Sequence, residues 1–114
     1  MRMTKDVCDI NTVGMGKVMS AGVLLLAAGT KGKRKIGANC RVMIHGVAGG
    51  FGGNLTTMEN EIEEIKWIQE RYISCLAAET KLTVKRLKKM IRRQVDVYLS
   101  AEQAVEFGIA DEII

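Results

Sequence analysis

Residues 41–53 read RVMIHGVAGGFGG, and the expected fold can be built outward from this stretch. An apolar run ends at His45, the only histidine of the chain, and five of the next eight residues are glycine. The run predicts a strand over residues 40–44. Glycine in extended backbone marks a place where another backbone comes close. We therefore expect a peptide segment to lie beside His45 as an added strand.

The segments on both sides of this strand predict an α/β fold with a parallel sheet, because strands and helical patterns alternate along the chain. Further strands are expected over residues 7–13, 33–36, 96–99 and 109–114, with a turn at 14–16. Helices are expected over residues 20–29, 57–79, 84–93 and 100–108. The first of these helices is apolar on every side, so we expect it to be buried, with Gly29 as its C-cap.

The longest expected helix begins with the capping-box pattern Thr56-Thr-Met-Glu59, in which Thr56 is the N-cap. Its apolar residues recur at steps of three and four and form one stripe. The members of this stripe are Ile62, Ile65, Ile68, Tyr72, Ile73 and Leu76. A helix over residues 57–79 is about 34 Å long, which is more than a small domain usually needs. A second capping box, Ser100-Ala-Glu-Gln103, opens the last helix.

Length and composition describe one globular domain that spans residues 1–114. Hydrophobic residues make up 47% of the chain and charged residues 26%, and the length allows a buried core without disulfide bonds. The longest apolar run, residues 21–28, is far too short to span a bilayer. Acidic and polar residues follow the basic start, where a signal peptide needs an apolar region. We therefore expect a cytoplasmic protein that does not enter a membrane.

Two basic clusters carry most of the net charge of +4. The first comprises Lys31, Lys33, Arg34 and Lys35, and the second comprises Lys81, Lys85, Arg86, Lys88, Lys89, Arg92 and Arg93. Such clusters can meet nucleic acid, but only 4% of the residues are aromatic and none lies among the basic ones. Without a stacking platform for bases, we expect two solvated basic faces and no bound nucleic acid.

The cysteines Cys8, Cys40 and Cys75 are widely spaced and include no CxxC pair. This pattern disfavours both a disulfide framework and a zinc site. A free cysteine usually behaves as a small buried hydrophobe, and we expect that role for all three. No metal or other cofactor is expected.

Three single residues are candidates for chemistry, and each also has a purely structural interpretation. Ser20 precedes an apolar helix, where serine is usually an N-cap, but free backbone N–H groups at the same place can hold an oxyanion. His45 is either a satisfied structural histidine or a general base. Asp96 is either a surface carboxylate or the group that orients the His45 ring. The residues alone leave these alternatives open.

Taken together, three segments resemble the proteolytic subunit of the Clp protease, the ClpP family of serine peptidases. Residues 20–34, SAGVLLLAAGTKGKR, are similar to the nucleophile segment of that family. Residues 41–45, RVMIH, are similar to its histidine segment. Residues 96–111, DVYLSAEQAVEFGIAD, are similar to its aspartate segment and last helix. The order and spacing of these segments agree with the family over nearly the whole chain.

The resemblance implies a fold and a set of site residues. The fold would be the ββα spiral of the ClpP and crotonase families, here its C-terminal portion, with the helix over residues 57–79 as a protruding handle. Ser20 would be the nucleophile, His45 the general base, and Asp96 the group that orients His45. The backbone N–H of Ala21 would donate to the oxyanion. A substrate strand would pair with Gly49, Gly50, Phe51, Gly52 and Gly53.

The implied function is that of a serine endopeptidase that hydrolyses peptide bonds in unfolded polypeptides, as an ATP-dependent Clp-type subunit. The implied partners are copies of the chain in a heptameric ring or double ring, an AAA+ unfoldase that consumes ATP, and the polypeptide substrate. Relative to the family, the chain is expected to lack the N-terminal part. Two alternatives stay open: a non-catalytic or fragmentary assembly subunit, and a phage-type capsid-maturation protease of the same clan.

Overall fold

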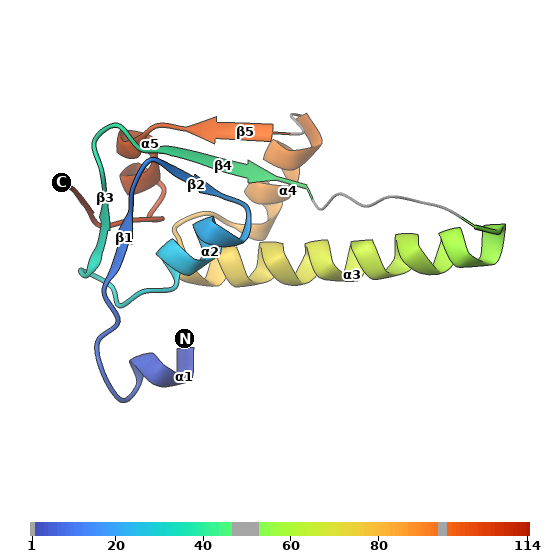
Figure 1. The fold of residues 1–114 in the computed structure, drawn as a ribbon, viewed down its shortest axis with the longest axis horizontal. Helices are drawn as coiled ribbons and strands as arrows, with labels where there is room; N and C mark the ends of the chain where they lie inside the picture. The colour runs from blue at the N-terminus through green and yellow to red at the C-terminus, as the bar shows by residue number, and fades with distance from the viewer. Residues whose placement is uncertain (1, 47–52, 94–95) are drawn as a thin grey trace.

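Two three-stranded β-sheets form the body of the computed structural model, which describes residues 2–46, 53–93 and 96–114. One sheet has the strand order β1 (Thr12–Gly14), β3 (Arg34–Ile36) and β6 (Glu112–Ile113). The other has the strand order β2 (Lys17–Met19), β4 (Arg41–His45) and β5 (Asp96–Leu99). Figure 1 shows that the strands of the two sheets run in different directions.

The first four strands alternate between the two sheets. β1 and β2 are followed by α2 (Ala21–Ala27), and β3 and β4 are followed by α3 (Leu55–Glu79), so that a β-β-α order occurs twice. The pairs β1–β3, β3–β6 and β2–β4 are parallel. The pair β4–β5 is antiparallel, because the chain leaves β4 at His45 and enters β5 directly opposite, at Asp96. The predicted α/β fold is therefore confirmed, whereas the prediction of a single parallel sheet is wrong.

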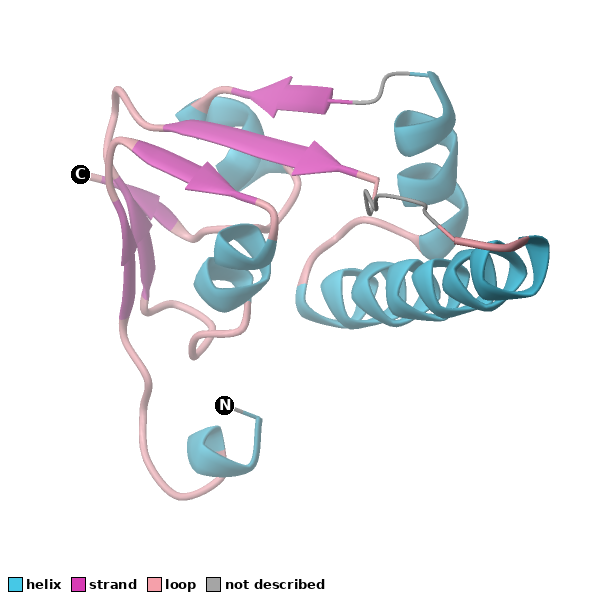
Figure 2. Cartoon of the chain, turned by 45° about the vertical axis from the view of Figure 1, so that its right-hand side comes forward, coloured by secondary structure: helices cyan, strands magenta, loops and turns pink. Residues whose placement is uncertain are grey.

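The helices pack around the sheets, and one of them projects far beyond the body. α2 packs against β1, β2 and the inner end of α3, and α4 (Val84–Arg93) packs between α3 and β5. α5 (Ala101–Glu106) contacts β4, β5 and β6, while the short α1 (Arg2–Lys5) stands at the N-terminal end. Because α3 extends past the sheets, the molecule measures 49 × 31 × 24 Å (Figure 2).

The hydrophobic core takes side chains from both sheets and from the inner part of α3. The largest fully buried side chains are Val23, Ile36, Val42, Ile44, Ile73, Leu76, Leu87 and Ile109. Burying one such side chain contributes roughly 2 kcal/mol. Within the apolar stripe of α3, Ile73 and Leu76 belong to this core, whereas Ile62 and Ile68 are 39% and 42% exposed. The core thus holds only the C-terminal part of this helix.

Of the two capping boxes predicted at helix N-termini, one is present in the structure and the other is not. The capping box of α5 is confirmed: Ser100 Oγ accepts the N–H of Gln103, and Gln103 Oε1 accepts the N–H of Ser100. The predicted cap of α3 is wrong. Asn54, not Thr56, is the N-cap, because its Oδ1 accepts both the backbone N–H of Thr57 at 2.9 Å and the Thr57 hydroxyl at 3.0 Å.

The structure corrects two expectations for α2. The helix is not buried on every side, because Leu25 is 58% exposed while Val23 and Leu26 face the core. Gly29 is not a left-handed cap, since α2 ends with Ala28 in a right-handed conformation. Glycine is needed at position 29 for close packing instead: a Cβ there would lie 2.6 Å from Thr12 Oγ1.

Strands were the least well predicted elements. Of the expected strand 7–13, only residues 12 and 13 lie in a strand, β1. Of the expected strand 109–114, only Glu112–Ile113 is a strand. Strand β2 was not predicted at all. These strands have two or three residues and owe their existence to pairing with β3 and β4, so the sequence pattern inside them is too short to reveal them. The predicted strands 33–36 and 40–44 match β3 and β4 closely.

The three cysteines are free thiols, but only Cys40 is buried; Cys8 and Cys75 are exposed, which corrects the expectation of three buried residues. Of the helices in the described ranges, none offers an apolar stretch of the length that crossing a bilayer requires.

A buried arginine joins the ends of three helices. Arg34 on β3 is only 3% exposed. Its Nη1 donates to the carbonyl oxygens of Ala27, Glu79 and Gly108 at 3.1, 3.0 and 2.7 Å. These carbonyls lie at or just beyond the C-terminal ends of α2, α3 and α5. The interpretation of the first basic cluster as a solvated face is therefore wrong for Arg34. The second cluster, on and near α4, is exposed as expected.

The carboxylate of Asp111 neutralises this arginine. Arg34 Nε and Nη2 donate to its two oxygens at 2.8 and 2.7 Å, and the backbone N–H groups of Gly32 and Arg34 donate to Oδ2 as well. The hydrogen bond from the Arg34 side chain is the main cause that lowers the pKa of Asp111 from 3.8 to about 2. The backbone hydrogen bonds act in the same direction, and burial partly opposes them.

This lowered pKa predicts acid sensitivity. Because the folded state holds the carboxylate in its charged form, Asp111 stabilises the fold above about pH 4 and loses this contribution as the pH falls toward 2. The contribution is on the order of 2 kcal/mol. We expect the free energy of unfolding, measured with urea between pH 6 and pH 2.5, to fall in this range for the parent chain. The variant Asp111→Asn should be less stable at pH 6, and its free energy of unfolding should change less with pH below pH 4.

The exposed neighbour Glu112 supplies a matched control. Glu112→Gln should keep the acid transition of the parent chain. An unchanged pH dependence in Asp111→Asn would contradict the assignment.

Candidate active site

Ser20 occupies a sharp turn between the end of β2 and the start of α2. Its φ is 52°, and among the described residues it is the one non-glycine residue with a positive φ. Such a backbone conformation costs on the order of 1–3 kcal/mol and persists only where the surroundings hold it. The Ser20 side chain makes no capping hydrogen bond. The structural interpretation of Ser20 as a simple N-cap is therefore wrong.

The backbone of Ser20 is held from several directions. Its N–H donates to the carbonyl of Met43 on β4 at 3.0 Å. Its carbonyl accepts the N–H of Val23 at 3.1 Å and the hydroxyl of Tyr72 on α3 at 2.9 Å. A strand, the first turn of α2 and a side chain from α3 thus fix the turn together.

The hydroxyl of Ser20 and the ring of His45 are hydrogen-bonded. Ser20 Oγ pairs with His45 Nε2. The parallel pairing of β2 with β4 accounts for this contact, since Met19 lies opposite Met43, which brings the residues that follow β2 beside the end of β4. Both side chains are half-buried. The fold thus brings together two predicted site residues that are 25 positions apart in the sequence.

The other ring nitrogen determines which way this hydrogen bond points. His45 Nδ1 lies 2.5 Å from the carbonyl oxygen of Gly46. A carbonyl can only accept, so Nδ1 carries the proton and Nε2 of the neutral ring is left as an acceptor. Ser20 then donates to His45. This is the arrangement that general-base activation of a hydroxyl requires.

Asp96 is brought alongside His45 but is not hydrogen-bonded to it. The two residues are direct partners in the antiparallel β4–β5 ladder. Cβ atoms of such partners are about 4.5–5.5 Å apart. The Asp96 side chain is exposed, and its carboxylate makes no hydrogen bond with any residue of the described ranges. The ring orientation seen here is set by Gly46, which sequence reasoning did not identify.

The remaining predicted site residues fall into two groups. Ala21 is the exposed first residue of α2, so its N–H has no acceptor within the helix. Gly53 is exposed and has a φ of 87° just before the cap of α3. Gly49, Gly50, Phe51 and Gly52 lie outside the described residues.

Gly46, the residue that follows His45, packs closely against α3 and α4. A Cβ at this position would lie 3.1 Å from Gln69 Oε1 on α3 and 3.1 Å from Ile91 Cγ2 on α4. The end of β4 therefore sits close against both helices, which limits how far His45 can move.

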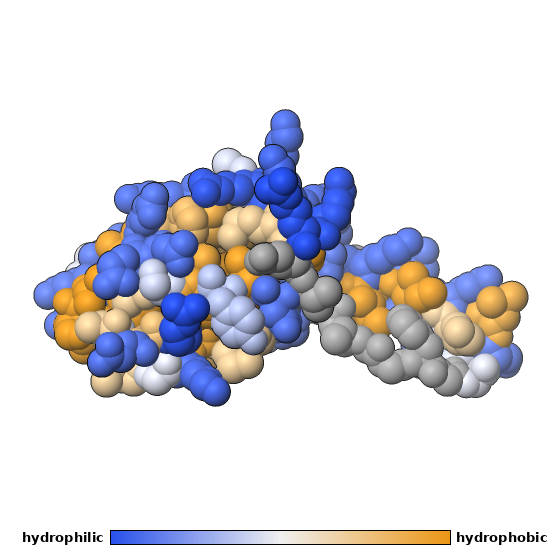
Figure 3. Space-filling view, turned by 90° about the horizontal axis from the view of Figure 1, so that it is seen from above, coloured by the Kyte–Doolittle hydropathy of each residue, from blue (hydrophilic) through white to orange (hydrophobic). Residues whose placement is uncertain are grey.

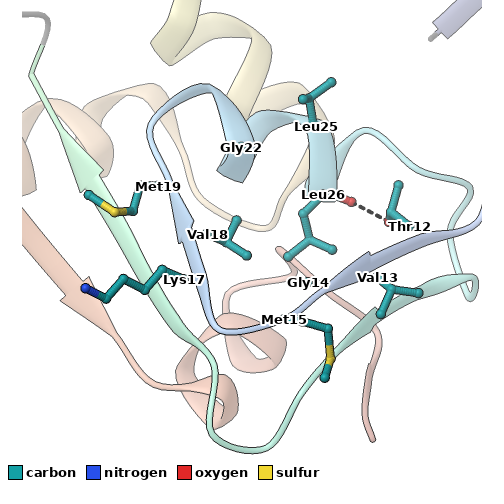
Figure 4. A pocket seen from close by; sticks show the side chains of 10 residues that line it. All are labelled: Thr12, Val13, Gly14, Met15, Lys17, Val18, Met19, Gly22, Leu25 and Leu26. Carbon is teal, nitrogen blue, oxygen red and sulfur yellow. Dashed lines mark hydrogen bonds between the residues drawn. The ribbon is translucent and has the colours of Figure 1, made fainter.

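An apolar hollow of about 650 Å³ flanks the site. Its lining comes from β1, β2 and α2 and consists of Thr12, Val13, Gly14, Met15, Lys17, Val18, Met19, Gly22, Leu25 and Leu26 (Figure 4). β1 and β2 are the outermost strands of their sheets. Met19 and Gly22, which lie on either side of Ser20 in the sequence, line the hollow, but Ser20 and Ala21 do not. No sequence signal pointed to it, because it depends on how the two sheets meet.

Within the described ranges, no group of three or more His, Cys, Asp or Glu side chains is placed to hold a metal ion.

One comparison with known proteins agrees with this geometry. The family model described as Clp protease matches residues 1–114, which is the entire sequence. The match confirms the resemblance that the serine, histidine and aspartate segments indicated. The chain belongs to the Clp protease family.

Proposed function

We propose that this chain is a serine endopeptidase that hydrolyses peptide bonds in unfolded polypeptides. The hydrogen bond between Ser20 and His45, formed at a strained strand-to-helix turn, is the observation that carries the proposal. Strain at such a turn directs a serine hydroxyl outward, and an accepting imidazole activates it. Membership in the Clp protease family supports the same conclusion.

The proposed reaction uses Ser20 and His45 in two steps. In the first, His45 Nε2 takes the hydroxyl proton while Oγ attacks the peptide carbonyl carbon. The imidazolium then gives this proton to the leaving amine, which leaves an acyl ester on Ser20. In the second step, His45 removes a proton from water as the water oxygen attacks the acyl carbon. The ester bond to Oγ then breaks, the carboxylic acid leaves, and the imidazolium returns the proton to Oγ. In both steps the N–H of Ala21 donates to the oxyanion, a contact whose loss in other enzymes costs on the order of 10²–10³ in rate.

Asp96 has the role of stabilising the imidazolium in this proposal. Its position opposite His45 in the β4–β5 ladder supports the assignment, because side chains of directly opposite residues lie on the same face of the sheet. The Gly46 carbonyl can orient a neutral ring, but it carries no full negative charge with which to stabilise a cation. Asp96 would therefore matter most when His45 becomes charged.

The substrate backbone would lie along the glycine-rich segment Gly49–Gly53. Side chains are nearly absent there, so a polypeptide can pair by its main chain with little regard to its sequence. Such binding suits unfolded chains.

Assembly is the second part of the proposal. The twofold β-β-α order is consistent with the ββα spiral of the ClpP and crotonase families. The outer part of α3 presents Leu55, Ile62, Trp67 and Ile68 to solvent, and Figure 3 shows apolar surface along the projecting helix. We propose that α3 is the handle that joins copies of this chain, in rings of the heptameric type that can pair into a double ring. The ring would act in the cytoplasm with an AAA+ unfoldase that consumes ATP.

A second candidate function follows from α3 alone. A large exposed apolar surface on a helix marks an interface whether or not the site turns over substrate. The chain would then be a non-catalytic assembly subunit. The reactivity of Ser20 separates the two functions.

The endopeptidase proposal predicts that Ser20 is a reactive nucleophile. A fluorophosphonate should form one covalent adduct per chain, detected by intact-mass spectrometry, because His45 activates Ser20. Ser20→Ala and His45→Ala should each abolish the adduct. Ser74→Ala, which removes an exposed serine on α3, should leave it unchanged. A folded parent chain that forms no adduct would favour the assembly subunit.

Asp96 is tested separately. Asp96→Asn keeps the size of the side chain and removes its charge, so the labelling rate should fall by about 10²-fold or more as the imidazolium loses its counter-charge. The exposed Asp9 provides a control, and Asp9→Asn should label at the parent rate. A change of less than about threefold in Asp96→Asn would mean that Gly46 alone positions the ring.

The assembly proposal predicts a loss of self-association. Ile62→Glu combined with Ile68→Glu places charges in the exposed stripe and should shift the protein toward monomers in analytical ultracentrifugation. Because both side chains are already exposed, the stability of the monomer should change by only about 0.5 kcal/mol. Ser74→Glu adds a charge to another face of the same helix and should assemble normally. Equal assembly of all three proteins would rule out this interface.

A further inference from the structure

The carbonyl of Ser20 receives a hydrogen bond from a residue far away in the sequence. Tyr72 Oη lies 2.9 Å from this oxygen, and the two residues are 52 positions apart. The N–H of Val23 donates to the same oxygen, but Val23 belongs to the first turn of α2, so this hydrogen bond forms whenever the helix forms. Tyr72 is different, because its side chain reaches across from α3. It ties the carbonyl side of the strained turn to α3, while the Ser20 N–H ties the other side to Met43 on β4.

Tyr72 is well placed to hold this oxygen. It is half-buried and packs against the hydrophobic core, next to the buried Ile73. The inner part of α3 is fixed by Ile73 and Leu76, which are 1% and 0% exposed. Burial raises the pKa of the Tyr72 phenol to about 12, so the group stays protonated and able to donate near neutral pH. A rigid helix therefore presents a permanent donor to the Ser20 carbonyl.

The direction of the Ser20 side chain depends on its backbone. With a φ of 52°, the residue is outside the conformations that it would adopt freely, and relaxation would rotate the peptide plane that contains its carbonyl. Such a rotation would swing the Cα–Cβ bond and move Oγ away from His45 Nε2. A hydrogen bond to the Ser20 carbonyl opposes this rotation, because it holds the oxygen that would have to move.

We propose that Tyr72 is a positioning residue for the nucleophile: its hydroxyl holds the Ser20 carbonyl so that Oγ stays directed at His45. It touches neither substrate nor reacting atoms and acts only through Ser20. The proposal rests on the proposed function where it concerns rate, but the geometry it predicts exists whether or not the chain turns over substrate. The two can therefore be tested apart.

The geometry is tested by nitrogen NMR of the ring of His45, which is the only histidine of the chain and gives a single pair of ring resonances. The Nε2 resonance reports whether this nitrogen accepts a hydrogen bond. In Tyr72→Phe it should move from its parent position toward the position measured in Ser20→Ala. In Tyr98→Phe, which alters an exposed tyrosine on β5, it should not move. An Nε2 resonance that stays at the parent position in folded Tyr72→Phe would overturn the proposal.

The rate is tested with the fluorophosphonate. Removing one hydrogen bond should slow labelling of Tyr72→Phe about fivefold to tenfold, while the final extent of labelling stays at one adduct per chain. A merely structural role would lower the extent instead, because a fraction of the chains would be misfolded. Replacing Tyr72 with 4-aminophenylalanine restores a donor at the same place and should recover most of the rate.

The two experiments give distinguishable failures. A parent chain that never reacts, together with an Nε2 resonance that moves in Tyr72→Phe, would contradict the endopeptidase and support the positioning role. A reactive parent chain whose rate and Nε2 resonance are both unchanged in Tyr72→Phe would contradict the positioning role and leave the endopeptidase intact.

Discussion

The structure depends most on the way a single buried cation is satisfied. Arg34 donates to three carbonyl oxygens and to both oxygens of Asp111. A buried charge is very costly unless it is paired and fully hydrogen-bonded. The carbonyls at helix C-termini carry partial negative charge, so a guanidinium is well suited to the point where three helices end. A lysine could not replace it, because one ammonium group lacks the planar fork that spans these acceptors.

This junction influences the site although it lies at the other end of α2. α2 runs from Ser20 to the carbonyl of Ala27, and α3 runs past Tyr72 to the carbonyl of Glu79. Both helices are therefore pinned at their C-terminal ends by the same side chain. The opposite end of α2 carries the strained serine, and the serine is held by β4 and by α3. Arg34 thus helps to fix the relative position of α2 and α3, the helices beside Ser20 and under Tyr72, whereas His45 is placed by the pairing of β4 with β2.

Sequence reasoning succeeded where the determining interactions are local. The capping box of Ser100 and Gln103 involves residues three apart, and the strand that leads to His45 is a continuous apolar run. The pairing of Ser20 with His45 came from the resemblance of whole segments to a family, which carries tertiary information that single residues do not. The cap of α3 was misplaced because Asn54 and Thr56 are both good N-caps, and only the folded turn decides between them.

The misses share a physical cause. Arg34 belongs to a run of basic residues that is expected to be solvated, and nothing near it in the sequence reveals that carbonyls from positions 27, 79 and 108 will surround it. Tyr72 belongs to an apolar stripe, in which its hydroxyl goes unnoticed until its partner is known. A buried tyrosine usually finds a hydrogen-bond acceptor. The presence of Tyr72 in the stripe therefore indicated that its hydroxyl has a partner, but not which residue the partner is. The short strands β1, β2 and β6 likewise exist only through their partners.

The long reach of the Arg34 contacts has a consequence for the order in which the protein is made. Its acceptors at Glu79, Gly108 and Asp111 are separated from it by 45, 74 and 77 residues. During synthesis, Ser20 and His45 emerge before Asp111, and a ribosome-bound chain that lacks Asp111 cannot bury Arg34 with its counter-charge. Contacts of such sequence separation also form slowly, since the ends of a long loop must first be brought together. The nascent chain therefore carries its serine and histidine before the Arg34 contacts can form, because these contacts wait until Asp111 has been synthesised.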